Sequence, residues 1–255
     1  GEIPASLGQL SELRTLNLRQ NGLSGKCPIP PELGKLSALE DLNLRRNQLS
    51  GTVPPELGNL AALQQLGLSR NGLSGHIPPQ LGNLGALQYL FLDNNKLDGP
   101  IPPELGKLTA LEDLRLWGKQ LSGPIPKELG ALSKLEQLSL SHNKLTGPIP
   151  SELGHLSALK ELTLYGNQLS GHIPPQLGDL SALKTLDLRW NKLDGPIPSE
   201  LGNLTALKEL NLANNQLSGH ISPQLGQLGA LEFLGLSNNK LNGEFKQIKT
   251  VFFES

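Results

Sequence analysis

This sequence has few cysteines, little net charge and no long apolar run. It has a single cysteine, Cys27, in 255 residues, so no disulfide can form within the chain. Its 22 basic and 23 acidic residues leave a net charge of −1, and this balance gives no overall field to hold nucleic acid or an anionic membrane surface. No apolar run approaches the roughly 18 residues of a membrane-spanning helix. We therefore expect neither nucleic acid nor a membrane as a partner.

Short motifs of catalytic sites are also missing. The chain contains no G-x-x-x-x-G-K, no G-x-S-x-G and no G-x-G-x-x-G. These motifs form the loops that hold a nucleotide phosphate, a nucleophilic serine and a dinucleotide. The sequence therefore gives no reason to expect catalysis or a bound cofactor.

A 24-residue unit is repeated along nearly the whole chain. Residues 39–58 read LEDLNLRRNQLSGTVPPELG, and the position that closes L-x-L-x-x-N recurs after 26 residues once and after 24 residues eight times. The residues at this position are Asn21, Asn47, Asn71, Asn95, Lys119, Asn143, Asn167, Asn191, Asn215 and Asn239. A strict period in this range predicts a solenoid, in which each repeat contacts its neighbours.

The full unit, L-x-x-L-x-L-x-x-N-x-L-S-G-x-I-P-x-x-L-G-x-L-x-x, resembles the plant-type leucine-rich repeat. Such repeats are found in ectodomains of receptor-like kinases and receptor-like proteins and in polygalacturonase-inhibiting proteins. Similar repeats occur in algal proteins, including those attached to GTPase modules of the ROCO type. The resemblance implies an α/β repeat solenoid, a right-handed leucine-rich-repeat superhelix. It leaves the function open, because one fold hosts many kinds of site.

Each unit predicts one short strand and one helical turn. Leu66 and Leu68 alternate with Gln65, Gly67 and Ser69, so the leucines should face inward and the others outward. Stacked units predict a ten-stranded parallel concave sheet. The Asn after each strand should form a ladder of hydrogen bonds between turns of the superhelix.

The second half of each unit should return along the convex side. The Gly of S-G, such as Gly51, allows a positive φ, and I-P-P then fixes an extended path. The following x-x-L-G is expected to form a short 3-10-like helical turn ended by its Gly. We predict one domain, with the array of about ten repeats at residues 1–243, the first repeat partial, and a C-terminal cap or the start of a following segment at residues 244–255.

Four departures from the repeat stand out. Lys26-Cys27 is a two-residue insertion that should bulge a loop. Lys119 replaces a ladder Asn, which predicts a local rearrangement or, beside Trp117, a ligand contact. Ser222 replaces the Pro of I-P. The tail GEFKQIKTVFFES leaves the pattern, and its aromatic and aliphatic residues could cover the apolar end of the stack.

The titratable columns of the repeat do not indicate an active site. The glutamates of P-E-L-G recur at the convex turn of repeat after repeat, as expected of a solvated face. His76 and His172 share one repeat position but lie four repeats apart, about 19 Å at the strand spacing of a sheet. They cannot share a metal ion. We expect no enzyme activity, no metal and no cofactor.

Aromatic residues are few, and their placement is selective. Six of the nine occupy outward positions of the strand segment: Tyr89, Phe91, Trp117, Tyr165, Trp190 and Phe233. Aromatics flanked by charges serve as anchors in protein recognition surfaces. The candidate ligand-binding residues are Tyr89, Phe91, Asp93, Asp113, Arg115, Trp117, Tyr165, Arg189 and Trp190. The alternative is that aromatics simply suit strands.

The outward positions differ from repeat to repeat, unlike the constant framework. The first outward position reads Thr15, Asp41, Gln65, Tyr89 and Asp113 in the first five repeats. An ice-binding or purely structural solenoid should instead present a regular column. This variation favours recognition of a specific partner.

The sequence thus predicts a non-enzymatic module that binds a protein or peptide on its concave sheet. Its resemblance to plant-type repeats implies the ligand-binding part of a receptor-like or immune-type protein, at the cell surface or outside the cell, and we expect a monomer. Two alternatives remain: an inhibitor of a secreted wall-degrading enzyme, and an intracellular scaffold segment of a larger ROCO-type signalling protein. Plant-type extracellular arrays usually carry Cys pairs at both caps, so the single Cys27 leaves a cytoplasmic location open.

Overall fold

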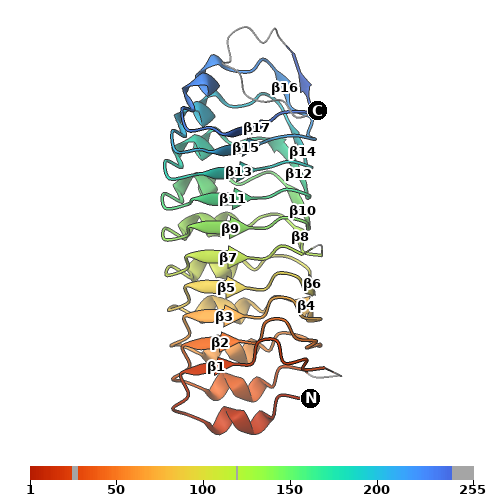
Figure 1. Cartoon of the computed structure of the whole chain (residues 1–255), viewed down its shortest axis with the longest axis vertical. Helices are drawn as coiled ribbons and strands as arrows, with labels where there is room; N and C mark the ends of the chain where they lie inside the picture. The colour runs from red at the N-terminus through yellow and green to blue at the C-terminus, as the bar shows by residue number, and fades with distance from the viewer. Residues whose placement is uncertain (25–27, 119, 243–255) are drawn as a thin grey trace.

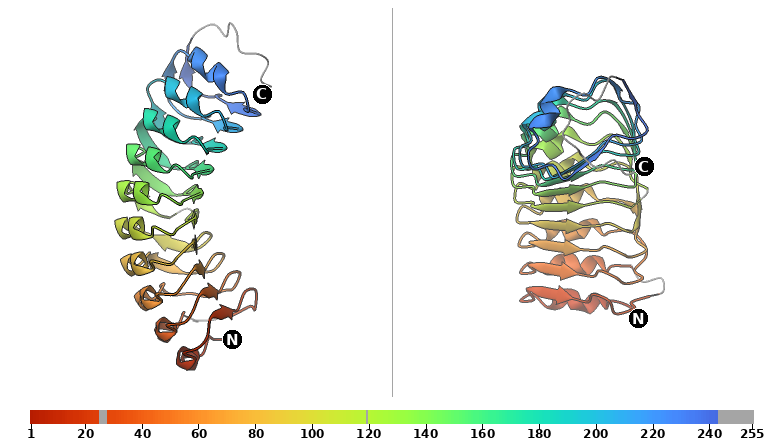
Figure 2. Two further views of the ribbon diagram at one scale, coloured as in Figure 1. Left: turned by 90° about the vertical axis from the view of Figure 1, so that its left-hand side faces the viewer. Right: turned by 45° about the horizontal axis from the view of Figure 1, so that its top comes forward.

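The protein is a curved stack of repeats. The structure is a computed structural model that describes residues 1–24, 28–118 and 120–242. One strand per repeat lies on the inner side of the curve and one helical turn on the outer side (Figure 1, Figure 2). The predicted solenoid with a concave sheet and convex turns is confirmed.

The concave sheet has ten parallel strands in the described residues, in the order of the chain. Neighbouring strands pair in register with the repeat, so Leu66 pairs with Leu90 and Leu90 with Leu114. The strands are β1 (Thr15–Asn17), β2 (Asp41–Asn43), β3 (Gln65–Gly67), β5 (Tyr89–Phe91), β7 (Asp113–Arg115), β9 (Gln137–Ser139), β11 (Glu161–Thr163), β13 (Thr185–Asp187), β15 (Glu209–Asn211) and β17 (Phe233–Gly235).

The leucines of the repeat form one continuous core between the sheet and the convex turns. Leu66 and Leu68 are fully buried, as are their counterparts Leu162 and Leu164 four strands away. Burying such a side chain stabilises the fold by about 1.5–3 kcal/mol. The core thins toward the last described repeat, where Leu234 and Leu236 are only partly buried.

The asparagine ladder has the predicted form. The Oδ1 atom of Asn47 accepts hydrogen bonds from the backbone N–H groups of Asn21 and Leu23, at 2.9 and 3.1 Å. Its Nδ2 group donates to the carbonyls of Leu18, in the preceding repeat, and Leu44, in its own. Each asparagine thereby satisfies backbone groups that would otherwise be buried without partners.

The convex turns are five-residue 3-10 helices. They are η1 (Ala5–Gln9), η2 (Pro31–Lys35), η3 (Pro55–Asn59), η4 (Pro79–Asn83), η5 (Pro103–Lys107), η6 (Lys127–Ala131), η7 (Ser151–His155), η8 (Pro175–Asp179), η9 (Ser199–Asn203) and η10 (Pro223–Gln227). The expectation that the Gly of L-G ends the turn is wrong. Gly34 lies within η2, and a Cβ there would overlap the carbonyl oxygen of Glu56 in the next turn. This glycine is required by close packing of consecutive turns, whereas Gly51 has the predicted positive φ, at 82°.

A second set of short strands flanks the concave sheet, where the sequence predicted only an extended path. These strands are β4 (Ser74–His76), β6 (Lys96–Asp98), β8 (Ser122–Gly123), β10 (Lys144–Gly147), β12 (Gln168–His172), β14 (Lys192–Asp194), β16 (Ser218–Gly219) and β18 (Lys240–Leu241). Strands β8, β10, β12 and β14 form one four-stranded sheet, and β4 pairs with β6. Between these two sheets only a single bridge, Gly99 to Leu121, is formed by described residues.

The departures from the repeat have different outcomes. Ser222 caps η10, because its side chain accepts a hydrogen bond from the backbone N–H of Gln224, a contact that the Pro of other repeats cannot make. The Lys26-Cys27 insertion, Lys119 and the predicted cap at residues 244–255 lie outside the described residues.

Candidate functional site: the concave sheet

The first group of predicted residues packs around Phe91. The guanidinium groups of Arg45 and Arg115 lie over its ring, at 4.6 and 5.0 Å from the centroid. Tyr89 stacks beside it, with ring centroids 6.1 Å apart. Phe91 is only 7% exposed, so its outward position on the strand does not leave it open to solvent. We call Arg45, Tyr89, Phe91, Asp113 and Arg115 the Phe91 cluster.

The charge of Arg115 in the Phe91 cluster is matched by Asp113. Arg115 donates to both carboxylate oxygens of Asp113, at 2.7 to 3.0 Å, and to Gln137. Burial raises the pKa of Asp113, while the hydrogen bond from Arg115 opposes this rise. The bond to Asp113 raises the pKa of Arg115. Tyr89 donates its hydroxyl to Glu112 at 2.9 Å, which raises the tyrosine pKa.

Asp93 is held by its neighbours in a similar way. It is 4% exposed, and its carboxylate accepts hydrogen bonds from the Ser69 hydroxyl and the Asn94 amide. Burial lowers the pKa of Arg45, and the charge of Asp93 partly offsets this effect. Asp93 therefore lies beneath the concave surface, where its neighbours fix its position.

A second group gathers around Tyr165, three strands away. Arg189 lies over the Tyr165 ring at 4.7 Å, and His142 meets it edge-on, also at 4.7 Å. The Arg189 side chain forms an ion pair with Asp187 at 3.3 Å. Asp187 is 4% exposed, and burial raises its pKa to about 6, against the opposing hydrogen bond and charge of Arg189. We call His142, Tyr165, Asp187 and Arg189 the Tyr165 cluster.

The two tryptophans lie outside both clusters. Trp190 is 61% exposed and stands in the turn after β13 with a φ of 57°. It makes no aromatic stacking contact with a described residue. Trp117 lies between the clusters and is half-buried.

A hollow separates the clusters at strand β9. The outward residues there are short, Ser139 and Ser141 among them, whereas Trp117 on one side and Tyr165 on the other are long. The hollow has a volume of about 310 Å³ and is also lined by Arg115, Gln137, Leu138, Glu161 and Thr163. We call it the β9 notch.

The polar groups at the base of the β9 notch are not all satisfied. The Ser139 hydroxyl accepts a hydrogen bond from Thr163 at 3.0 Å. Ser141 is 1% exposed, and its hydroxyl has no hydrogen-bond partner. An unpaired buried hydroxyl costs about 1–3 kcal/mol. It is the only buried side-chain polar atom in this condition among the described residues.

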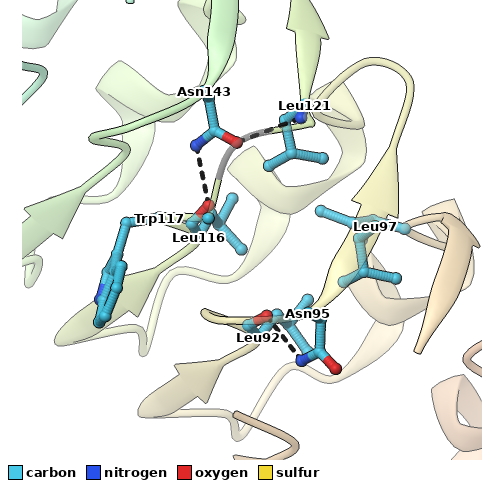
Figure 3. Close-up of a pocket in the computed structure, with 9 residues that line it drawn as sticks. Leu92, Asn95, Leu97, Leu116, Trp117, Leu121 and Asn143 are labelled. Carbon is cyan, nitrogen blue, oxygen red and sulfur yellow. Dashed lines mark hydrogen bonds between the residues drawn. The ribbon is translucent and has the colours of Figure 1, made fainter. Parts of the chain in front are cut away.

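The space on the other side of Trp117 cannot hold a ligand. A void of about 10 Å³ lies among Leu92, Leu97, Leu116 and Leu121, which is room for one water molecule at most. Asn143 bridges this region by accepting from the Leu121 amide and donating to the Leu116 carbonyl. The Trp117 ring extends away from these leucines (Figure 3). This void is therefore part of the packed interior.

Sequence reasoning missed several residues of this surface. His142, Glu112, Ser139 and Ser141 are not among the residues that the sequence predicts for the site. The signal that could have found them is the 24-residue offset, because Arg189 and Tyr165 occupy the same position in adjacent repeats. Among the described residues there is no group of three His, Cys, Asp or Glu that could hold a metal ion. Within the same residues, no helix is both long and apolar enough to cross a membrane.

The model of the family described as "Leucine-rich repeat region" matches residues 1–147, more than half of the chain. The chain belongs to the leucine-rich repeat family. Further models of leucine-rich repeats match residues 133–193 and 206–228. A comparison with curated protein sequences finds no match.

Solved structures of leucine-rich repeat proteins are similar over nearly the whole chain. The ectodomain of the Arabidopsis thaliana membrane receptor kinase GASSHO1/SCHENGEN3, in complex with CASPARIAN STRIP INTEGRITY FACTOR 2, is 44% identical, with a TM-score of 0.90 over 93% of this chain and 28% of that one. The Arabidopsis receptor kinase HAESA, in complex with the peptide hormone IDA and the co-receptor SERK1, is 41% identical, with a TM-score of 0.88 over 94% of this chain and 40% of that one.

The same fold also occurs in a protein with a different role. A plant ice-binding protein is 34% identical, with a TM-score of 0.73 over 85% of this chain and 69% of that one. The present chain spans less than half the length of the two receptor structures described above.

Proposed function

We propose that this leucine-rich repeat array is the non-enzymatic ligand-binding part of a receptor-like protein. Its ligand is a peptide or an extended protein segment that lies across the concave sheet. The β9 notch carries this proposal, because it is an open hollow between the aromatic side chains of Trp117 and Tyr165. The similar receptor ectodomains were solved with a named factor and with a peptide hormone, which supports a ligand of this class.

The predicted residues take different parts in this proposal. Trp117, Tyr165 and Trp190 present aromatic surface to a ligand, and aromatic anchors contribute most of the energy in such interfaces. The other predicted residues, Tyr89, Phe91, Asp93, Asp113, Arg115 and Arg189, are engaged with one another or with nearby residues. They border the ligand path and keep its walls rigid.

Irregularity of the outward columns distinguishes this proposal from ice binding. Strands β5, β7 and β9 present Tyr89, Asp113 and Gln137 at one register position. The surface of an ice crystal would be matched by one small residue repeated at this position in every strand. A ligand with its own sequence is matched by a column that changes from strand to strand.

A binding screen against a triple variant tests the proposal. The purified array and its variant with Trp117, Tyr165 and Trp190 changed to Ala would be screened against random peptide libraries and tissue extracts. Peptides or proteins retained by the parent should be lost from the variant. Both proteins should melt at similar temperatures, since the three side chains are outside the leucine core. Retention of the same partners by both proteins would move the site off this part of the sheet.

We further propose that the array lies outside the cell. Asn203-Leu204-Thr205 forms an N-glycosylation sequence at the exposed end of η9, on the convex face. Expressed behind a secretory leader, the protein should be secreted with one glycan, which Asn203→Gln removes. Gly85→Thr creates the same sequence at Asn83 of η4, where a side chain meets no other atom within 4 Å, and should add a second glycan. Retention of an unmodified parent would favour the intracellular scaffold.

A further inference from the structure

We propose that the β9 notch receives a basic side chain, lysine or arginine, of the bound peptide. This inference rests on the proposed function and adds the chemistry of one ligand position. Three features of the notch lead to it: the spacing of its walls, its unmatched carboxylate and its unpaired hydroxyl.

The walls of the notch suit a long, narrow side chain. Trp117 and Tyr165 occupy the same position in repeats that are two apart, so their strands are separated by about 10 Å. An aliphatic chain with a van der Waals contact on each side fills about 7–8 Å of such a gap. Aromatic walls also attract a cation that lies over their rings.

Charge in and around the notch favours a cation. The positive charge of Arg115 is matched by Asp113 at 2.7 Å, and that of Arg189 by Asp187 at 3.3 Å. Glu136 is matched by Lys160 at 2.7 Å. Glu161 lines the notch and is exposed. It forms no ion pair within 4 Å among the described residues, although its charge acts on Arg115. Glu161 is therefore the carboxylate of the notch that a ligand cation would match.

The hydroxyl of Ser141 gives the notch a further polar partner. It lies just under the surface at the base of the hollow and has no hydrogen-bond partner. Serine populates three side-chain rotamers, so a rotation about one bond can turn this hydroxyl toward a ligand. The ammonium group of lysine or the guanidinium of arginine would donate to it, and this would remove the cost of leaving the hydroxyl unpaired.

The decisive experiment measures which peptides the protein retains. The probes are pools of acetylated nonapeptide amides that are random except for a fixed central residue: lysine, arginine, norleucine or glutamate. Norleucine has the aliphatic chain of lysine without its charge. Retention on the immobilised chain is measured at about 0.15 M salt, where charges more than about 8 Å apart are largely screened. The lysine and arginine pools should be retained at least about fivefold more than the norleucine pool.

A matched pair of variants locates this preference. Glu161→Gln and Glu209→Gln each remove one negative charge from the same outward position, two strands apart. Glu161→Gln should reduce the preference for basic pools to less than about twofold, and Glu209→Gln should leave it unchanged.

The outcomes separate this inference from the proposed function. Equal retention of the four pools, or equal effects of the two variants, would overturn the inference and leave peptide binding intact. Retention of none of the pools above a blank surface would overturn both.

Discussion

The Phe91 cluster and the β9 notch lie side by side on one sheet, yet their side chains are used differently. Around Phe91, two arginines cover the aromatic ring, and Asp113 holds one of them in place. In the notch, the Glu161 carboxylate forms no ion pair within the described chain, and the Ser141 hydroxyl has no hydrogen-bond partner there. The side chains around Phe91 are thus engaged with one another, whereas two polar groups of the notch are left without such partners.

This difference shows that residue type alone is a poor guide to a binding surface. Phe91 and Trp117 were equally good candidates by sequence, because both are aromatic and both occupy outward positions. Contacts with neighbouring repeats bury Phe91 and leave Trp117 on the wall of a hollow. The exposure of an outward aromatic residue thus depends on how the side chains of neighbouring repeats pack against it.

The largest effect should come from the core that both regions share. Leu140→Ala beneath the notch and Leu92→Ala beneath the Phe91 cluster should each lower the free energy of unfolding by about 2–5 kcal/mol, because each leaves a cavity. Leu16→Ala in β1 should cost less, since this strand pairs on one side only. Urea unfolding followed by circular dichroism measures all three. Equal losses at Leu16 and Leu140 would contradict stabilisation by nearest neighbours.

A smaller effect should separate the two regions directly. Phe91→Ala should cost about 2–4 kcal/mol of unfolding free energy, because a buried aromatic ring and its contacts with two arginines are lost. Trp117→Ala should cost less than about 1 kcal/mol, as a surface substitution does. The same denaturation measurement compares them. A loss at Trp117 as large as that at Phe91 would mean that the notch is also a structural element.

The smallest effect concerns pH and compares Asp187 with Asp113. The pKa of Asp187 is about 6 in the folded protein, against about 3.9 in an unfolded chain. The folded state therefore binds this proton more tightly, and ionisation of Asp187 lowers stability as pH rises from about 4 to 6. Asp187→Asn removes this loss, so the variant should gain about 1–3 kcal/mol on the parent between pH 4 and pH 7.

Asp113→Asn provides the control for this measurement. Burial also raises the pKa of Asp113, but Arg115 binds its carboxylate at 2.7 Å. Asp113→Asn should therefore change the pH dependence of the free energy of unfolding less than Asp187→Asn does. Urea unfolding at several pH values measures both. A pH dependence that is the same in the parent and in Asp187→Asn would show that Asp187 does not titrate in this range.

The framework of this fold could be predicted from the sequence because it is repeated. The parallel strand at Leu66, the ladder position at Asn47 and the positive φ at Gly51 each follow from local geometry and are confirmed. The role of Gly34 could not be predicted, since it depends on how close the next turn approaches. The flanking strands were missed for the same reason, because they exist only through pairing between repeats.

The candidate site was less predictable, because it depends on side chains that differ between repeats. The sequence placed the aromatic residues on the concave face but could not show that Arg45 and Arg115 would cover Phe91. The hollow arises where Ser139 and Ser141 stand between longer neighbours, and the sequence reveals it only when residues 24 positions apart are compared. Absence of bulk at one strand is visible only when three strands are compared.

The asparagine ladder makes the two ends of the stack unequal. The Asn239 side chain accepts a hydrogen bond from the Leu217 amide and donates one to the Leu212 carbonyl, both in the preceding repeat. The backbone groups of each repeat are therefore satisfied by the asparagine of the repeat that follows it. Removing repeats from the amino-terminal side takes away no asparagine that the remaining backbone needs. Removing them from the carboxyl-terminal side strips bonds from the last repeat that is left. Shortening the array one unit at a time should therefore be better tolerated from its amino-terminal end.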